Sequence, residues 1–194
     1  MAFNYFLISS QVHQEKNALS EAAWILSSLS SYTNIESFKA KLLPVGGLGL
    51  LQLENAIDLP EDIPKTISTL AEEEKIYYCF KIIPLEKFDI VSEEFLLDWV
   101  NYNLERFDGY STWKVEINKR HSTLNRKSLI NTIAKRISNP VDLKSPEIIL
   151  QIEIIGKYVG IGLLHPYQII QLGSLLSELN DQIIDEEEEV ENGL

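Results

Sequence analysis

Apolar and polar positions in the first half of the chain follow the spacings of alternating strands and helices. Residues 3–10 are rich in aromatic and β-branched side chains and predict a strand. Residues 14–30 carry apolar side chains three and four positions apart, which predicts an amphipathic helix. The further elements expected here are two strands, a helix and a last strand, over residues 35–43, 48–53, 60 or 64 to 74, and 75–84.

This order of elements, β-α-β-β-α-β, is typical of the ferredoxin-like arrangement, an antiparallel sheet with both helices on one face. The turn-rich residues 44–47 connect the two middle strands. The last strand fits the end of this domain or the start of the next, so the boundary stays open at this point. We place an N-terminal ferredoxin-like domain at residues 1–75 and a second domain at residues 76–180.

The second half also mixes helices and strands. A helix is expected over residues 92–106, for which Ser92 is a suitable N-cap, and an alternating strand over residues 111–118. Asn125 is expected to cap a helix that runs to residue 138. Two strands joined at Gly156-Lys157 and a short closing helix complete the domain, over residues 148–155, 158–164 and 169–179. The predicted fold class is therefore α+β.

Charge is distributed unevenly along the chain. The net charge is −12, but residues 110–170 hold nine basic and four acidic residues. A phosphate backbone responds to the field within a Debye length of about 8–10 Å, so this local excess of positive charge matters more than the total. Residues 181–194 contain seven acids and no base, and we expect this tail to be disordered because it cannot bury enough apolar surface.

Cysteine use and hydropathy indicate a soluble protein of a reducing compartment. Cys79 is the only cysteine, so no intramolecular disulfide can form. No apolar run approaches the roughly 18 residues that a membrane-spanning helix needs. The first residues lack the basic and apolar regions of a signal peptide. We expect a cytoplasmic protein with no membrane association.

Residues that could catalyse a reaction or hold a metal are scattered. His13, His121 and His165 have no carboxylate or cysteine at ligand spacing. The glycines of residues 46–49 are interpreted as a hairpin corner rather than a phosphate cradle, and Cys79 as a packed core thiol inside a strand. We therefore predict that the chain is not an enzyme and uses neither a cofactor nor a metal.

The most informative stretch is the basic segment that leads from the strand over residues 111–118 into the next helix. Its side chains, together with free N–H groups at a helix N-terminus, suit phosphate. A lysine stripe along the helix would by itself favour a solubilising surface, but the cluster at the strand end favours an anion site. The predicted RNA-binding residues are Lys119, Arg120, His121, Ser122, Arg126, Lys127, Lys135 and Lys144.

Four segments resemble those of THUMP domains, in the order of that family. Residues 113–123, Trp-Lys-Val-Glu-Ile-Asn-Lys-Arg-His-Ser-Thr, resemble the strand and basic turn. Residues 141–146, Val-Asp-Leu-Lys-Ser-Pro, are similar to the Val-Asp-Leu-x-x-Pro segment. The entry segment and the closing strands are matched by residues 80–85, 152–154 and 159–161. The resemblance covers about residues 76–172.

The resemblance implies that the second domain, residues 76–180, is a THUMP domain that binds tRNA, commonly at the acceptor end. Most THUMP proteins carry a tRNA-modifying enzyme in the same chain. The Lys-Arg-His-Ser-Thr sequence and the length of 194 residues are most similar to the adaptor of an RNA cytidine acetyltransferase, which makes N4-acetylcytidine in tRNA. The implied role is that of a non-catalytic adaptor whose partners are tRNA and this separate enzyme.

Two alternatives stand beside this role. One is an adaptor for a different tRNA-modifying enzyme, such as a methyltransferase. The other is a protein-interaction module with little RNA binding, which the net charge of −12 favours. The chain also departs from the family pattern, because its N-terminal half is acidic and it ends in acids where related adaptors have basic extensions.

Overall fold

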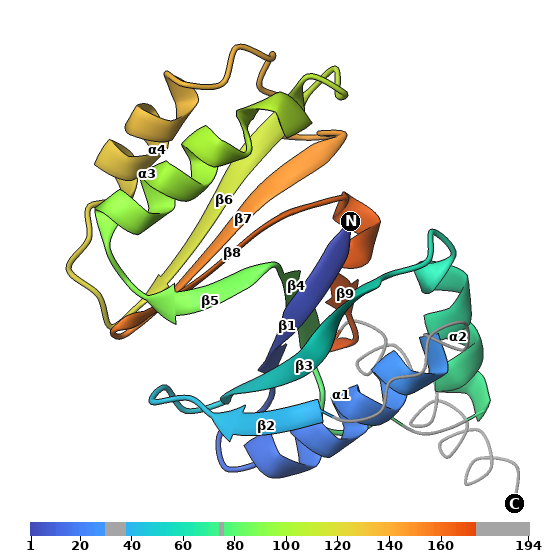
Figure 1. Ribbon diagram of the computed structural model, residues 1–194. Coiled ribbons are helices and arrows are strands. Elements are labelled where there is room, and N and C mark those ends of the chain that lie inside the picture. Colours follow the sequence, from blue (N-terminus) through green and yellow to red (C-terminus); the bar gives the residue numbers. More distant parts are fainter. Residues whose placement is uncertain (30–37, 74–75, 174–194) are drawn as a thin grey trace, which may run out of the picture.

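Two sheets face each other, and a pair of helices covers the outer face of each (Figure 1). This arrangement is seen in a computed structural model, which describes residues 1–29, 38–73 and 76–173. The predicted acidic tail, residues 181–194, lies outside the described residues. The two sheets form the inner layers and the helices form the outer layers. The predicted α+β class is therefore confirmed.

The first sheet contains five strands in the order β2-β3-β1-β4-β9, and every pair in it is antiparallel. Its strands are β1 (Ala2–Ser9), β2 (Phe38–Leu42), β3 (Leu48–Asp58), β4 (Lys81–Leu85) and β9 (Ile170–Gln171). Helices α1 (Glu15–Leu29) and α2 (Ile63–Glu73) pack on the same face of the sheet. The first four strands and two helices thus have the ferredoxin-like order that the sequence predicts.

The strand predicted over residues 75–84 begins only at Lys81. The backbone N–H groups of Tyr77, Tyr78 and Cys79 donate to the carboxylate of Glu21 at 2.8, 2.9 and 2.6 Å. These amides are therefore held by a side chain of α1 rather than by a neighbouring strand, which explains why an apolar run does not become a longer strand.

The closing helix predicted over residues 169–179 is also wrong at its start. Ile170 and Gln171 form β9, which pairs with Ile82 and Lys81 of β4, while residues 174–179 lie outside the described residues. The apolar side chain of Ile170 is buried in the core of the first sheet, and this tertiary contact outweighs the local helical pattern. Both β4 and β9 fall within the predicted second domain but pair into the first sheet, so the boundary at residue 75 stays a prediction.

The second sheet has four strands in the order β5-β8-β7-β6. Strands β6 and β7 run parallel to each other, and the remaining pairs are antiparallel. The strands are β5 (Lys87–Ile90), β6 (Trp113–Arg120), β7 (Ile148–Ile155) and β8 (Tyr158–Leu164). Helices α3 (Glu93–Tyr102) and α4 (Arg126–Ala134) cover the outer face, and two 3-10 turns, Leu104–Phe107 and Pro166–Gln168, lie in the connections.

A third apolar cluster joins the two sheets. It includes Leu7 and Leu50 from the first sheet, Leu85 at the end of β4, and Ile155 from the second sheet. The chain crosses between the sheets at Glu86, directly over β8, where a Cβ on Gly162 would lie only 3.1 Å from the Glu86 nitrogen. The sheets are therefore packed face to face through apolar side chains, and the connection between them runs close to the backbone of β8.

Glu86 fixes this crossing. Its carboxylate accepts two hydrogen bonds from the guanidinium of Arg106, at 2.7 and 2.8 Å, and a third from the N–H of Leu163 at 3.0 Å. The hydrogen bond to Glu86 raises the pKa of Arg106. A bidentate arginine pair of this kind holds the crossing in one geometry.

We expect Arg106→Ala to lower the free energy of unfolding by about 1–3 kcal/mol, because a mostly buried carboxylate loses its partner. For a chain of this length the melting temperature should fall by roughly 2–12 °C. The matched control is Arg136→Ala, which removes an exposed guanidinium bound to Asn101 and to the Thr132 carbonyl. Equal melting temperatures for the two variants would contradict the role given to Glu86.

Candidate nucleic-acid interface

The basic segment forms the connection between β6 and α4. Asn125 accepts a hydrogen bond from the Ser128 N–H at 3.0 Å, which confirms it as the N-cap of α4. His121 has a positive φ of 55°, so the chain turns sharply just after β6 ends. The helix therefore starts beside the carboxyl end of β6, with its first N–H groups and Arg126 and Lys127 at the same edge of the sheet.

We call this edge the β6 basic end; it comprises Lys119, Arg120, His121, Ser122, Arg126 and Lys127. Arg126 and Lys127 are exposed, and neither side chain has a hydrogen-bond or ion-pair partner within the described part of the chain. The ammonium of Lys119 donates to the Leu124 carbonyl at 2.9 Å, and Ser122 Oγ accepts from the Leu124 N–H at 3.3 Å. The turn is therefore ordered by its own polar groups and presents several cations to solvent.

Arg120 differs from its neighbours because it is tied to a buried acid. Its guanidinium lies 2.9 Å from Glu153, whose side chain is 0% exposed. The same carboxylate accepts hydrogen bonds from Asn118 and Gln151, each at 2.7 Å. The Gln151 carbonyl oxygen has no partner among the described residues, so its amide is oriented to serve Glu153. One function of Arg120 is therefore to neutralise a buried charge.

The structure does not bring all eight predicted residues to one place. Lys135 is the C-cap of α4, eight residues after Lys127, which corresponds to roughly 12 Å along the helix axis. Lys144 follows the bridge between Trp113 and Val141, at the amino end of β6. That end lies roughly 23 Å from the carboxyl end of an eight-residue strand. Lys135 and Lys144 thus belong to the opposite end of the second sheet.

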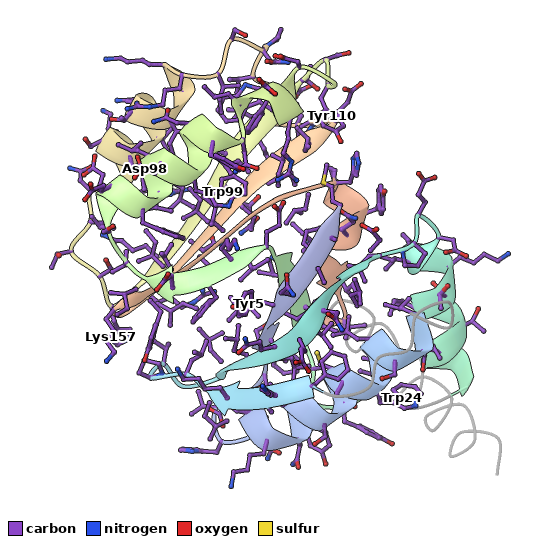
Figure 2. The ribbon with its side chains drawn as sticks, viewed as in Figure 1. Tyr5, Trp24, Asp98, Trp99, Tyr110 and Lys157 are labelled. Atoms are coloured by element: carbon purple, nitrogen blue, oxygen red, sulfur yellow. The ribbon has the colours of Figure 1, made fainter. Side chains whose placement is uncertain are left out.

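Two lysines that the sequence did not single out lie near the β6 basic end. The Gly156 N–H donates to the Arg120 carbonyl at 2.8 Å, which places the β7–β8 turn, and Lys157 with it, beside this end (Figure 2). The ammonium groups of Lys157 and Lys41 lie 5.4 and 4.6 Å from the centre of the Tyr158 ring. Lys41 comes from β2, so the first sheet adds positive charge to an edge of the second.

Tyr158 is the centre of a small aromatic group that joins the sheets. Its ring stacks on Phe88 at 5.6 Å, and Phe88 in turn lies 6.2 Å from Tyr5 of β1. Lys157 belonged to the basic segment counted in the sequence, but only the hairpin register shows its position beside Arg120. Lys41 lies in the acidic half of the chain, and no sequence signal would have assigned it to this edge.

Other candidate chemistry in the described part of the chain is sparse. No group of three or more histidine, cysteine or acidic side chains there could hold a metal ion. Cys79 is fully buried, and burial raises the pKa of its thiol, which is the setting of a core thiol rather than a nucleophile. It lies before β4 rather than in a strand. No helix among the described residues is long and apolar enough to cross a membrane.

Comparison with family models matches residues 71–164 to the THUMP domain. The chain contains a THUMP domain. The matched residues run from the end of α2 to the end of β8, so the THUMP match includes the whole β6 basic end. No curated protein matches the sequence.

Solved structures share the fold at low sequence identity. TrmN from Thermus thermophilus superposes with a TM-score of 0.51 and 15% identity, over 84% of this chain and 47% of that one. A 4-thiouridine synthetase, solved with RNA and bound ATP, has a TM-score of 0.50 and 14% identity, over 87% and 42%. PH1313 from Pyrococcus horikoshii Ot3 has a TM-score of 0.50 and 13% identity, over 87% and 55%. The chain therefore spans about half the length of these proteins.

Proposed function

We propose that the chain binds tRNA through the β6 basic end of its THUMP domain and presents it to a separate modifying enzyme. The observation that carries this proposal is the meeting of Lys119, Arg126 and Lys127 with the N-terminus of α4 at one edge of a parallel strand pair. Exposed cations and free N–H donors on rigid elements suit the phosphates of a nucleic acid.

The remaining predicted residues contribute to the proposed RNA surface in different ways. His121 and Ser122 lie in the turn itself, Arg120 adds the guanidinium donors that Glu153 leaves free, and Lys157 with Lys41 extends the positive edge. Lys135 and Lys144 would meet a second stretch of the same RNA, since a tRNA is longer than the second sheet. The 4-thiouridine synthetase that shares the fold was solved as an RNA complex, which supports an RNA ligand.

For the modifying enzyme, we propose an RNA cytidine acetyltransferase that makes N4-acetylcytidine, with the present chain as a non-catalytic, cytoplasmic adaptor. The support is the Lys-Arg-His-Ser-Thr sequence of residues 119–123. An adaptor for another tRNA-modifying enzyme, such as a methyltransferase, would use the same RNA surface.

The first test is binding of the full chain to matched tRNAs with and without the single-stranded 3′ end at physiological salt. We expect the intact tRNA to bind at least tenfold more tightly, because recognition of the acceptor end adds to the electrostatic attraction. Equal binding with a Kd of about 10⁻⁴ to 10⁻⁶ M for both would mean that only non-specific charge acts, which would contradict the proposal.

The second test identifies the reaction. Mass spectrometry of tRNA from cells that lack the protein should show loss of N4-acetylcytidine, with other modified nucleosides unchanged. Loss of a different nucleoside would support the alternative adaptor role. The net charge of −12 favours a protein-interaction module, for which nuclease-insensitive protein partners without bound RNA would be the expected result.

A further inference from the structure

Within the described part of the chain, the edge of the first sheet at β2 is open. Strand β2 pairs with β3, and no other described strand pairs with its far side. The N–H of Leu43 donates to the Leu48 carbonyl at 3.1 Å, which shows that Leu43 is one of the residues whose backbone groups face β3. Because hydrogen-bonded residues alternate in an antiparallel pair, the backbone groups of Phe38, Ala40 and Leu42 point outward. These are the groups to which another strand could bind.

A groove runs along the same strand on its helix side. It has a volume of about 400 Å³ and lies between α1, which contributes Leu19 and Ala23, and the side chains of Phe38, Ala40 and Leu42. Leu42 is 48% exposed. Helix α1 packs mainly over β1 and β3, so the apolar side of β2 is left without a full cover. The open backbone edge and the apolar groove therefore belong to one surface.

The charge around this surface is positive. Lys39 and Lys41 alternate with the groove residues and lie on the opposite face of β2, and Lys16 of α1 lines the groove itself. Among the residues that the structure describes, none that lines the groove is acidic. A second copy of the chain is a poor occupant, because antiparallel pairing of two β2 strands centred on Ala40 would place Lys39 opposite the other copy's Lys41.

We propose that β2 and the groove bind an extended segment of a partner protein in which apolar and acidic residues alternate. The segment would add a sixth strand to the first sheet, with hydrogen bonds to Phe38, Ala40 and Leu42. Its apolar side chains would enter the groove, and its acidic side chains would lie beside Lys39 and Lys41 on the other face. This surface would bind a protein through the backbone of β2 and the groove, and it shares Lys41 with the positive edge proposed for RNA.

The experiment uses the full chain and a fluorescein-labelled synthetic peptide of eight alternating leucine and glutamate residues. The matched probe has lysine in place of glutamate. Fluorescence anisotropy should show at least tenfold tighter binding of the acidic peptide. Amide resonances of residues 38, 40 and 42 should shift on addition of this peptide. Equal affinity for the two peptides, or shifts confined to other residues, would overturn the proposal.

Variants of the chain separate backbone pairing from charge. Ala40→Pro removes an outward N–H without breaking the ladder to β3, and it should weaken binding of the acidic peptide by at least tenfold while tRNA binding is unchanged. Lys39→Glu should reverse the preference between the two peptides, whereas Lys65→Glu on α2, an equal change in charge, should not. An unchanged affinity of a folded Ala40→Pro variant would sink the proposal.

One further variant distinguishes the occupants. Deletion of residues 174–194, which include eight acids, should leave the affinity for the acidic peptide within about threefold. A tenfold increase would mean that this part of the same chain competes for the groove, which would overturn the assignment to a separate protein. A dimer that Ala40→Pro dissociates would overturn it in favour of a second copy.

Discussion

Charge reversal at Lys119, Arg126 and Lys127 together is expected to weaken tRNA binding on the order of 100-fold at physiological salt. Each of these side chains is exposed at the β6 basic end, and each charge-assisted contact with phosphate contributes about 1 kcal/mol or more. Loss of three contacts should also lower the slope of log K against log salt concentration by about three, because fewer counterions are released. The measurement is a filter-binding or anisotropy titration at several salt concentrations.

The control is a triple variant with the same change in net charge at a different place, Lys16→Glu, Lys39→Glu and Lys65→Glu on α1, β2 and α2. It should lose less than about threefold in affinity, since it changes the overall field but none of the proposed contacts. Both triple variants must retain the circular dichroism spectrum and melting profile of the natural chain. Equal losses in the two variants would show that total charge, and not the β6 basic end, governs binding.

Local signals in the sequence were sufficient for much of the fold. The strands over 148–155 and 158–164 were predicted with the bounds that the structure shows, because each is a mainly apolar run and Gly156, with a positive φ of 59°, marks the turn between them. The caps Ser92 and Asn125 were found because their side chains accept hydrogen bonds from the first turn of each helix. These features depend on residues close together in the chain.

Features that depend on distant residues were missed. Strand β5 has only four residues without clear alternation, and it exists because it pairs with β8 some seventy residues later. The predicted strand over 75–84 was too long because Glu21, far upstream, binds three of its amides. The start of the predicted helix over 169–179 is β9, which forms only because β4 offers an open edge. A propensity pattern contains no information about such partners.

The same distinction applies to the candidate site. The sequence identified the basic residues but placed them in one group, whereas β6 and α4 separate Lys144 and Lys135 from the β6 basic end. In the sequence, Glu153 counted only as one of the four acidic residues that partly cancel nine basic residues over residues 110–170. In the structure that acid is buried beneath Arg120 and holds it in place, so its effect is local and structural. The sequence gives no sign of which acid is buried.

Glu153→Ala is expected to destabilise the fold by about 3–5 kcal/mol, since it removes a buried carboxylate and leaves its partners unpaired. Three donors would lose their acceptor at once, on Arg120, Asn118 and Gln151. The melting temperature should fall by roughly 6–20 °C for a chain of this size. The control Glu116→Ala breaks a more exposed pair with Lys114 and should cost less than about 1 kcal/mol.

A double variant separates the two functions of Arg120. When Glu153→Leu is combined with Arg120→Met, both charges leave together, so the double variant should be more stable than Glu153→Leu alone. If Arg120 serves mainly to neutralise Glu153, this double variant should bind tRNA within about fivefold of the natural chain. A loss as large as that of the Lys119, Arg126 and Lys127 variant would instead show that the Arg120 guanidinium contacts the RNA directly. Glu153 would then be the residue that aims this guanidinium at its ligand, because its carboxylate fixes one side of the group while the other side faces solvent.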